Sequence, residues 1–416
     1  MNLRACHVMA ALALTGSLLS PAVRADSLTL PQVLALAERN NPRLKIASAG
    51  IDRARSAAVT ARAYPNPEIE ALTGGVRARV PGITSGQGLS VSVGQPIDLP
   101  SHRAPRIRAA ESGAESAALA AQETFLQLRA DVKQAFYSVL RRQAEFDLAI
   151  DNQKLLEQTR NRIELSVNVG ERARFELVRV EAELANAVNQ TASARLRVSQ
   201  AVAQLKILVG ANADAPLEVS GELQPIAPPE SLEELQAAMQ DRYPAFRRAR
   251  AEVSQVESRL EAERALKVPR PTLFAGMDRD PEQSRALFGV SIPIPVWDQR
   301  QGPVGEAVAA LQQTAMVAEQ QKLLLRGELE VNYSRLLIAR QQIAAFEGGL
   351  IRRAESALKV AEAAFRFGER GFLEVLDAQR VLRSVRAEFL AARFDKQSAL
   401  VEIERLTARD LNGEVK

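Results

Sequence analysis

The tetrapeptide Val169-Gly170-Glu171-Arg172 divides a proline-free run that extends from Arg106 to Ala215. Proline breaks helices, and glycine commonly ends them. Gly170 stands 65 residues after Pro105, so the run predicts a helix on the order of 100 Å long at about 1.5 Å per residue. We expect a tight turn at Gly170 and a second long helix that runs back along the first.

The second half of the chain repeats this arrangement. Gly368-Glu369-Arg370 begins 65 residues after Pro303, inside a proline-free run from Val304 to Lys416. A helix of this length does not fit into a compact globule of 416 residues. The sequence therefore predicts an elongated, mainly α-helical molecule with two antiparallel helical hairpins, built by internal duplication.

The duplication predicts the organisation of the whole chain. Residues 1–25 have the positive start, short apolar stretch and small-residue end of a secretory signal peptide. We expect a first structural repeat over 26–215, a linker over 216–230 and a second repeat over 231–416. Each repeat would contain two shorter helices, a Pro-x-Pro sequence, a strand pair and one long hairpin, with its tip near residue 170 or 368.

Apolar and polar residues alternate in two zones, near 68–97 and 272–294, and each zone predicts a β-hairpin. An ordinary half-buried hairpin fits these segments locally. Strands with one lipid-facing side explain them better, because no apolar run of 18 residues follows the signal peptide. Four strands cannot close a barrel, and an open edge in lipid leaves backbone groups unpaired. Several chains would share one barrel, and three chains would supply twelve strands.

Composition argues against an enzyme and against a nucleic-acid-binding protein. Without residues 1–25 the chain holds 52 basic and 50 acidic residues, a net charge of +2, with the two signs alternating along the predicted helices. His102 is then the only histidine, cysteine is absent and three methionines remain. Metal-ligand clusters and Ser/His/Asp sets are nearly excluded, and no glycine-rich phosphate loop occurs. We expect no catalytic residue, no cofactor and no resident metal.

The chain resembles the TolC-like outer-membrane efflux factors, and among them the heavy-metal, CzcC-like branch that serves resistance-nodulation-division pumps. The hairpin tips Val169-Gly170 and Phe367-Gly368 match that family's tips. Residues 95–103, Gln-Pro-Ile-Asp-Leu-Pro-Ser-His-Arg, resemble the branch's Q-x-I-E-L-G-G-K-R segment, with Pro-Ser-His in place of Gly-Gly-Lys. Residues 291–302 resemble the counterpart segment in the second half.

The resemblance implies a homotrimer in the Gram-negative outer membrane, with a twelve-stranded β-barrel in lipid and an α-barrel across the periplasm. It implies a passive exit duct for divalent heavy-metal cations, joined to a periplasmic adaptor (membrane fusion protein) and an inner-membrane pump. Multidrug efflux or type I protein secretion through the same architecture is an alternative. A soluble periplasmic adaptor or a coiled-coil scaffold is an alternative of a different class.

The resemblance also implies site residues at the hairpin tips. The pore constriction and gate would comprise Glu374, Asp377, Glu176, Arg370 and Phe365. Glu374 and Asp377 occupy the positions of the family's acidic ring, although a solvated helix face is the alternative interpretation. Arg370 would tie neighbouring hairpins together through the region of Glu176. The adaptor would bind the tips themselves, which are Val169, Gly170, Glu171, Arg172, Phe367, Gly368, Glu369 and Gly371.

Overall fold

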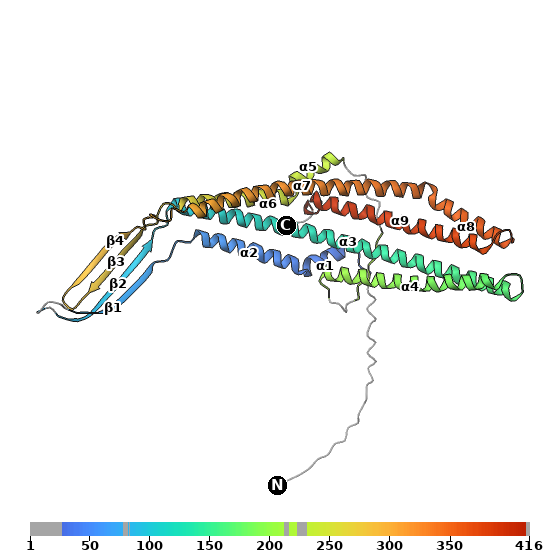
Figure 1. Cartoon of the computed structure of the whole chain (residues 1–416), viewed down its shortest axis with the longest axis horizontal. Coiled ribbons are helices and arrows are strands. Elements are labelled where there is room, and N and C mark those ends of the chain that lie inside the picture. The colour runs from blue at the N-terminus through green and yellow to red at the C-terminus, as the bar shows by residue number, and fades with distance from the viewer. Residues whose placement is uncertain (1–26, 78–81, 83, 212–215, 223–230, 413–416) are drawn as a thin grey trace, which may run out of the picture.

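The computed structural model describes residues 27–77, 82, 84–211, 216–222 and 231–412. The predicted signal peptide and residues 223–230 of the predicted linker lie outside the described residues. The molecule is a long rod, with a sheet of four strands at one end and two helical hairpin turns at the other (Figure 1). The tips of the hairpins and the sheet therefore lie at opposite ends of the molecule.

Two shorter helices open each half of the chain, as predicted. They are α1 (Leu30–Asn40) and α2 (Pro42–Arg62) in the first half, and α5 (Leu232–Arg242) and α6 (Pro244–Ala265) in the second. Pro42 and Pro244 each occupy the first position of a helix, where the backbone N–H has no partner within the helix and its absence costs no hydrogen bond. The residue before a proline avoids the helical region, so the same prolines also end α1 and α5.

The first long hairpin consists of α3 (Pro100–Asn168) and α4 (Arg174–Val209). The outgoing helix α3 has 69 residues, close to the predicted length. It begins at Pro100 and not at Arg106, so the prediction placed its start too late. Pro100 occupies the first helical position, and Pro105 is accommodated inside the helix near that end.

The second long hairpin departs from the prediction of one uninterrupted outgoing helix. It consists of α7 (Gln301–Ala345), α8 (Ile351–Arg366) and α9 (Phe372–Leu406). A π-helical turn over Phe346–Leu350 separates α7 from α8, and Gly349 has a φ of 128° there. Residues with a Cβ rarely adopt this backbone conformation. The pair Gly348-Gly349 therefore breaks the helix without a proline.

The strands form one antiparallel sheet in the order β1-β2-β3-β4. Their bounds are Glu68–Val76 for β1, Gly86–Pro96 for β2, Thr272–Arg279 for β3 and Ser284–Ser291 for β4. Val93 pairs with both Ile69 and Ala275, and Ala275 pairs with Phe288. Paired residues share a face. One face of the sheet is thus apolar, and it is exposed: the side chain of Phe288 is 83% exposed.

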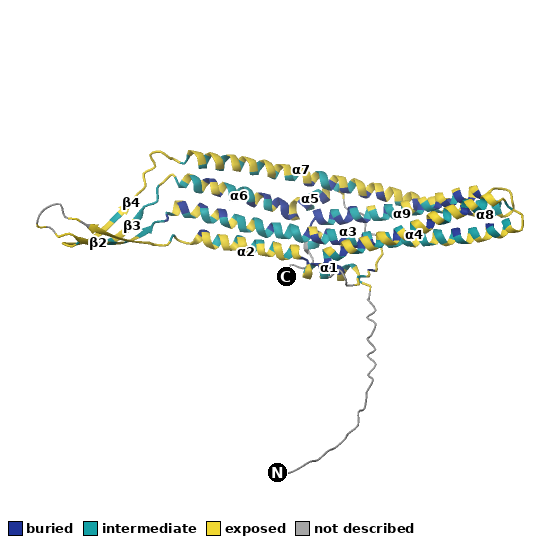
Figure 2. Ribbon diagram, turned by 60° about the horizontal axis from the view of Figure 1, so that its bottom comes forward, coloured by how far each residue is buried: buried dark blue, intermediate teal, exposed yellow. Residues whose placement is uncertain are grey.

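The cores lie along the helical rod, and Figure 2 shows buried residues concentrated in its middle. One cluster joins α1, α3 and α4, and a second joins α5, α6, α7 and α9. A third cluster lies near the tips and contains residues of α3, α4, α8 and α9. Among the described helices, none is both long enough and apolar enough to cross a bilayer.

Candidate gate and docking site at the hairpin tips

Both hairpin tips end their outgoing helix with the same backbone motif. The N–H groups of Gly170 and Glu171 donate to the carbonyls of Val167 and Ser166, at 3.0 and 2.9 Å. In the second half the donors are Gly368 and Glu369, and the acceptors are Phe365 and Ala364, at 3.2 and 3.0 Å. This pair of bonds is a Schellman motif, which satisfies carbonyls that a helix end leaves without partners.

The motif explains why glycine stands at each tip. Gly170 has a φ of 82° and Gly368 a φ of 73°, which is the left-handed region. Apart from the two adjacent residues, no atom lies within 4 Å of the position that a Cβ would take at either glycine. The requirement for glycine is thus one of backbone conformation and not of space. The preceding residues Val169 and Phe367 are exposed apolar side chains, so each tip presents a hydrophobic residue at its apex.

In the first half, one charged residue after the glycine, Arg172, packs against the second hairpin. Arg172 forms an ion pair with Glu176 at 3.1 Å, between its Nη1 and a carboxylate oxygen. Its Nη2 donates to the carbonyl oxygen of Phe365 at 3.1 Å, and its guanidinium carbon lies 3.7 Å from the Phe365 ring centre. The Phe365 ring in turn lies 5.5 Å from that of Phe372. Phe365 therefore has a structural partner in the opposite tip.

In the second half, the equivalent charges face solvent. Arg370 lies 3.5 Å from Glu374, and both side chains are largely exposed. Asp377 lies one helical turn further along α9, at 3.8 Å from Arg380, and is 63% exposed. The Arg380 guanidinium also pairs with Glu183 of α4, which connects the two hairpins. The second tip thus keeps two loosely paired carboxylates on the surface.

The predicted tie between Arg370 and the Glu176 region is not formed within the described chain. Glu176 is held by Arg172, and Arg370 lies against its own helix neighbour Glu374. The structure brings Glu176, Arg172 and Phe365 together, whereas Glu374 and Asp377 lie apart from them on α9. A contact between Arg370 and a neighbouring chain stays a prediction.

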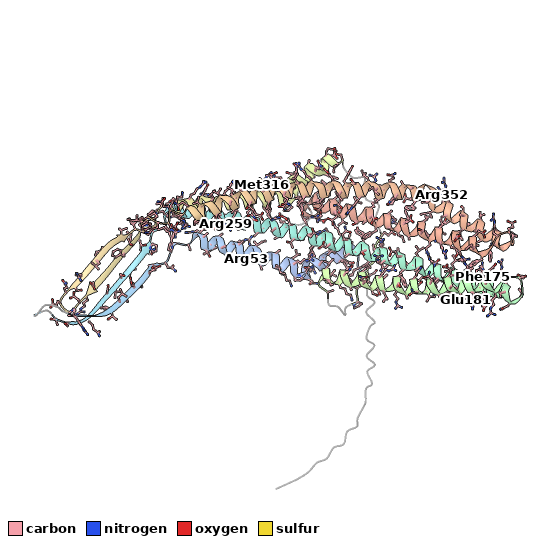
Figure 3. The ribbon with its side chains drawn as sticks, in the orientation of Figure 1. Arg53, Phe175, Glu181, Arg259, Met316 and Arg352 are labelled. Carbon is pink, nitrogen blue, oxygen red and sulfur yellow. The ribbon has the colours of Figure 1, made fainter. Side chains whose placement is uncertain are left out.

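Two features of the tips escaped the prediction from sequence. The contact between Arg172 and Phe365 was not predicted, because it joins residues from different halves of the chain and no local sequence pattern indicates it. Phe175, in the first turn of α4, is 69% exposed and lies at the tip end of the rod (Figure 3). Its counterpart Leu373, 198 residues later, is exposed too. That repetition of an apolar residue was the available signal.

A groove of about 460 Å³ lies beside the tips and is lined by residues of α3, α8 and α9. Its floor includes Ile163, Phe365 and Val375, and its rim carries Arg162, Glu362 and Arg366. An apolar floor with a charged rim suits contact with another protein. Among the residues that the structure describes, no group of three or more His, Cys, Asp or Glu side chains could hold a metal ion.

The sequence is similar to known efflux proteins over nearly its whole length. The sequence profile of the outer membrane efflux protein family matches residues 33–211 and 235–409, one stretch in each half. The cobalt-zinc-cadmium resistance protein CzcC of Cupriavidus metallidurans is 27% identical over 94% of this chain and 92% of its own. The nickel-cobalt-cadmium resistance protein NccC of Alcaligenes xylosoxydans xylosoxydans is 26% identical over 77% of this chain and 71% of its own.

The fold is similar to that of solved channels. A crystal structure of CusC, described as forming a transmembrane channel, superposes with a TM-score of 0.79 at 18% identity, covering 91% of each chain. The predicted family and fold are therefore confirmed, and the soluble adaptor or scaffold is set aside. The family consists of channels and not of enzymes. This chain belongs to the outer membrane efflux protein family, and its place is the outer membrane.

Proposed function

We propose that this channel is the passive exit duct of a tripartite efflux system and that its cargo is divalent heavy-metal cations. The similarity to CzcC along 94% of the chain supports this cargo class. Multidrug efflux and type I protein secretion are the alternatives, and neither has a residue-level feature in its favour. Energy coupling would reside in an inner-membrane resistance-nodulation-division pump, reached through a periplasmic adaptor.

The working form would be a homotrimer. The described sheet ends in the free edges of β1 and β4, and open edges are untenable in lipid. The helices α7 and α4, on long sides of the rod, also expose apolar residues. They are Met316 (Figure 3) and Leu323 on α7, and Leu196 and Ile207 on α4. Burying these sides against identical neighbours would cover both stripes. Three chains would pair β4 of each with β1 of the next and supply twelve strands.

Two exposed carboxylates carry the proposal for cation transport. Glu374 and Asp377 lie three residues apart on α9, and positions with this spacing share a helix face. Their arginine neighbours stand at 3.5 and 3.8 Å, and such exposed pairs are worth only about 0–1 kcal/mol. Three chains would bring six carboxylates to the narrow end of the duct. A ring of acidic side chains concentrates cations and repels anions.

The ring would attract cations without selecting one metal. Carboxylates are hard oxygen ligands, whereas transition metals prefer nitrogen and sulfur donors. The chain after residue 25 offers one histidine, no cysteine and three methionines. We infer that cations pass with much of their water shell, and that the choice of metal is made by the pump or the adaptor.

The tips would be the contact with the adaptor. Val169 and Phe367 stand exposed at the two apices, and Phe175 and Leu373 are exposed in the first turns that follow. These four apolar residues, together with the exposed carboxylates Glu171 and Glu369, give each hairpin a similar end, although Arg172 and Arg370 differ in their contacts. An adaptor that binds one hairpin could therefore bind the other in the same way.

The acidic ring can be tested by single-channel recording in planar bilayers. The double variant Glu374→Gln/Asp377→Asn should lose cation selectivity, seen as a shift of the reversal potential under a salt gradient. The control variant Glu319→Gln/Glu330→Gln removes the same charge from α7 and should behave as the unaltered channel. Equal selectivity in all three proteins would refute the ring.

The cargo is tested separately in cells. Deletion of the gene should sensitise cells to zinc, cobalt or cadmium, and the unaltered gene should restore growth. Sensitivity to dyes and antibiotics alone would overturn the cargo and leave the duct in place.

A further inference from the structure

The segment between β4 and α7 exposes an apolar run that the proposed duct does not use. Ile292, Ile294 and Val296 are 54–79% exposed, and Trp297 is 94% exposed. Trp297 is also the only tryptophan in the chain. We expect a large aromatic side chain that is this exposed to contact another molecule or a membrane, because an exposed apolar cluster usually marks a contact surface.

The chain on both sides of Trp297 is fixed. Before it, the Val296 N–H donates to the Ile294 carbonyl at 2.9 Å, and two prolines restrict the backbone. After it, the Arg300 N–H donates to a carboxylate oxygen of Asp298 at 2.8 Å. The Arg300 side chain then pairs with Glu263 of α6. Trp297 is thus presented to its surroundings from an anchored position.

The apolar run continues the exposed face of the sheet. Phe288 and Val290 lie on that face of β4, and Ile292 follows two residues later. The strand has 8 residues, or about 27 Å at about 3.4 Å per residue. A tilt of about 40° reduces this to roughly 20 Å across a bilayer, less than the apolar band of about 25 Å on outer-membrane barrels. The apolar band therefore needs residues beyond the end of β4.

Charge begins directly after Trp297. Asp298 and Arg300 follow it in the sequence, and both belong to the ion-pair and hydrogen-bond set that anchors the segment. The order along the chain is thus apolar strand, apolar segment, tryptophan, charge. Tryptophan is enriched where a bilayer's hydrocarbon meets its headgroups, because the ring is apolar and the indole N–H can reach water.

The equivalent segment of the first half, which follows β2, shows which residues the next strand covers. Pro96 and Arg103 precede Pro293 and Arg300 by 197 residues, which aligns Trp297 with Pro100. The segment after β2 packs beside β3, since the Ile97 N–H donates to the Pro271 carbonyl at 2.8 Å. Pro100 nevertheless stays exposed. A neighbouring chain placed the same way would cover Ile294 and leave Trp297 uncovered.

We propose that Trp297 inserts into the headgroup region of the periplasmic leaflet and marks the lower boundary of the channel in the outer membrane. The surrounding apolar run lies against the acyl chains next to it. The partner is therefore a phospholipid surface, and this assignment depends on neither the cargo nor the gate.

The sole tryptophan makes the test direct. The purified channel is reconstituted in phosphatidylcholine vesicles whose acyl chains are brominated near the headgroup, near the chain end or not at all. Bromine near the headgroup should lower the Trp297 fluorescence by about twofold or more, and bromine near the chain end should lower it less, as expected for interfacial tryptophan. Iodide added outside the vesicles should quench it weakly.

Two reference proteins calibrate the depth. Trp297→Phe with Phe288→Trp places the probe mid-strand, where chain-end bromine should quench most. Trp297→Phe with Phe367→Trp places it at the distant tip, where lipid bromine should have no effect. Strong iodide quenching without bromine quenching at Trp297 would put the ring in water and overturn the proposal. Protection from both quenchers would mean that a second copy of the chain covers it, which overturns the proposal equally.

Discussion

Arg172 and Phe365 join the tips of the two hairpins within one chain. The guanidinium carbon of Arg172 lies 3.7 Å from the Phe365 ring centre, and its Nη2 donates a 3.1 Å hydrogen bond to the Phe365 carbonyl. The same side chain holds Glu176. The equivalent arginine of the second half, Arg370, lies 3.5 Å from Glu374, and its side chain is 68% exposed. Equivalent arginines of the two halves therefore serve different contacts.

Replacing Arg172 with alanine should loosen the tips and spare the rest of the rod. The change removes a cation–π contact worth about 0.5–1 kcal/mol and a hydrogen bond worth about 1 kcal/mol. Amides near residues 166–172 and 364–370 should exchange hydrogen several-fold faster, while the unfolding temperature hardly changes. Arg174→Ala, two residues away on the exposed surface, is the control. Unchanged exchange in Arg172→Ala would mean that the contact has no role in ordering the tips.

Valine at Gly170 or Gly368 should distort a tip through local backbone strain, because a Cβ there meets no residue beyond its chain neighbours. The left-handed conformation costs a residue with a Cβ about 1–2 kcal/mol, and a β-branched residue suffers most. Trimers should still assemble, because the cores of the rod are distant, but export should fail. Asparagine tolerates this conformation, so Gly170→Asn and Gly368→Asn should retain most activity. Normal export by both valine variants would exclude a docking role for the tips.

Alanine at Arg370 should make the closed channel leak. Its side chain is exposed and only loosely engaged in its own chain, which leaves it available to a neighbouring hairpin. We expect a larger resting conductance in planar bilayers and greater sensitivity of cells to large antibiotics. Arg353→Ala, which removes an exposed arginine elsewhere, on α8, is the control. If conductance and resistance both stay at the unaltered level, Arg370 does not hold the gate.

Alkaline pH should weaken the middle of the rod through Tyr243. Burial raises the pKa of its phenol above the ordinary 10.0, and the Arg405 charge offsets part of that rise. Below about pH 10 the phenol is neutral in both the folded and the unfolded chain, so this contribution to stability is fully present. As pH rises further, the unfolded chain ionises first, and the contribution is lost as pH passes through the raised pKa of the folded chain. The unfolding temperature should fall above pH 10, and less steeply in Tyr243→Phe. Parallel slopes for the two proteins would contradict this.

Tyr243→Phe should also lower stability at neutral pH. The Arg405 Nη1 donates a 2.9 Å hydrogen bond to the Tyr243 hydroxyl, and this bond is buried. Removing the acceptor leaves a buried charged donor with one partner fewer, at a cost of about 1–3 kcal/mol. This loss is constant below pH 10, so it can be separated from the alkaline slope in the same set of melts.

The long hairpins were predictable because their signals are local and strong. Gly170 and Gly368 need a left-handed backbone, and that need is visible as a glycine at the same distance after Pro105 and Pro303. The strands were predictable from alternation, although their ends were not. The β1–β2 ladder continues to the pair Val76 and Gly86, beyond the alternating apolar residues that mark the strands in the sequence.

The misses were of two kinds. The break at Gly349 was not predicted, because helix ends were predicted from prolines and no proline occurs there. The pair Gly348-Gly349 was the signal in the sequence. The contact between Arg172 and Phe365 depends on how two hairpins pack side by side, which no residue pattern within either half encodes. The positions of Glu374 and Asp377 near a tip followed from their spacing after Gly368, whereas their loose pairing with Arg370 and Arg380 depends on side-chain conformations that the sequence does not encode locally.

The break at Gly349 makes the two halves mechanically unequal. The first outgoing helix is continuous for 69 residues, while its counterpart is jointed at a glycine that has no side chain to resist rotation. In a trimer, the continuous helix α3 of each chain and the interrupted pair α7 and α8 would alternate around the tube. A force applied at the hairpin tips would then bend the three interrupted helices more than the three continuous ones, and the tube would deform with threefold symmetry.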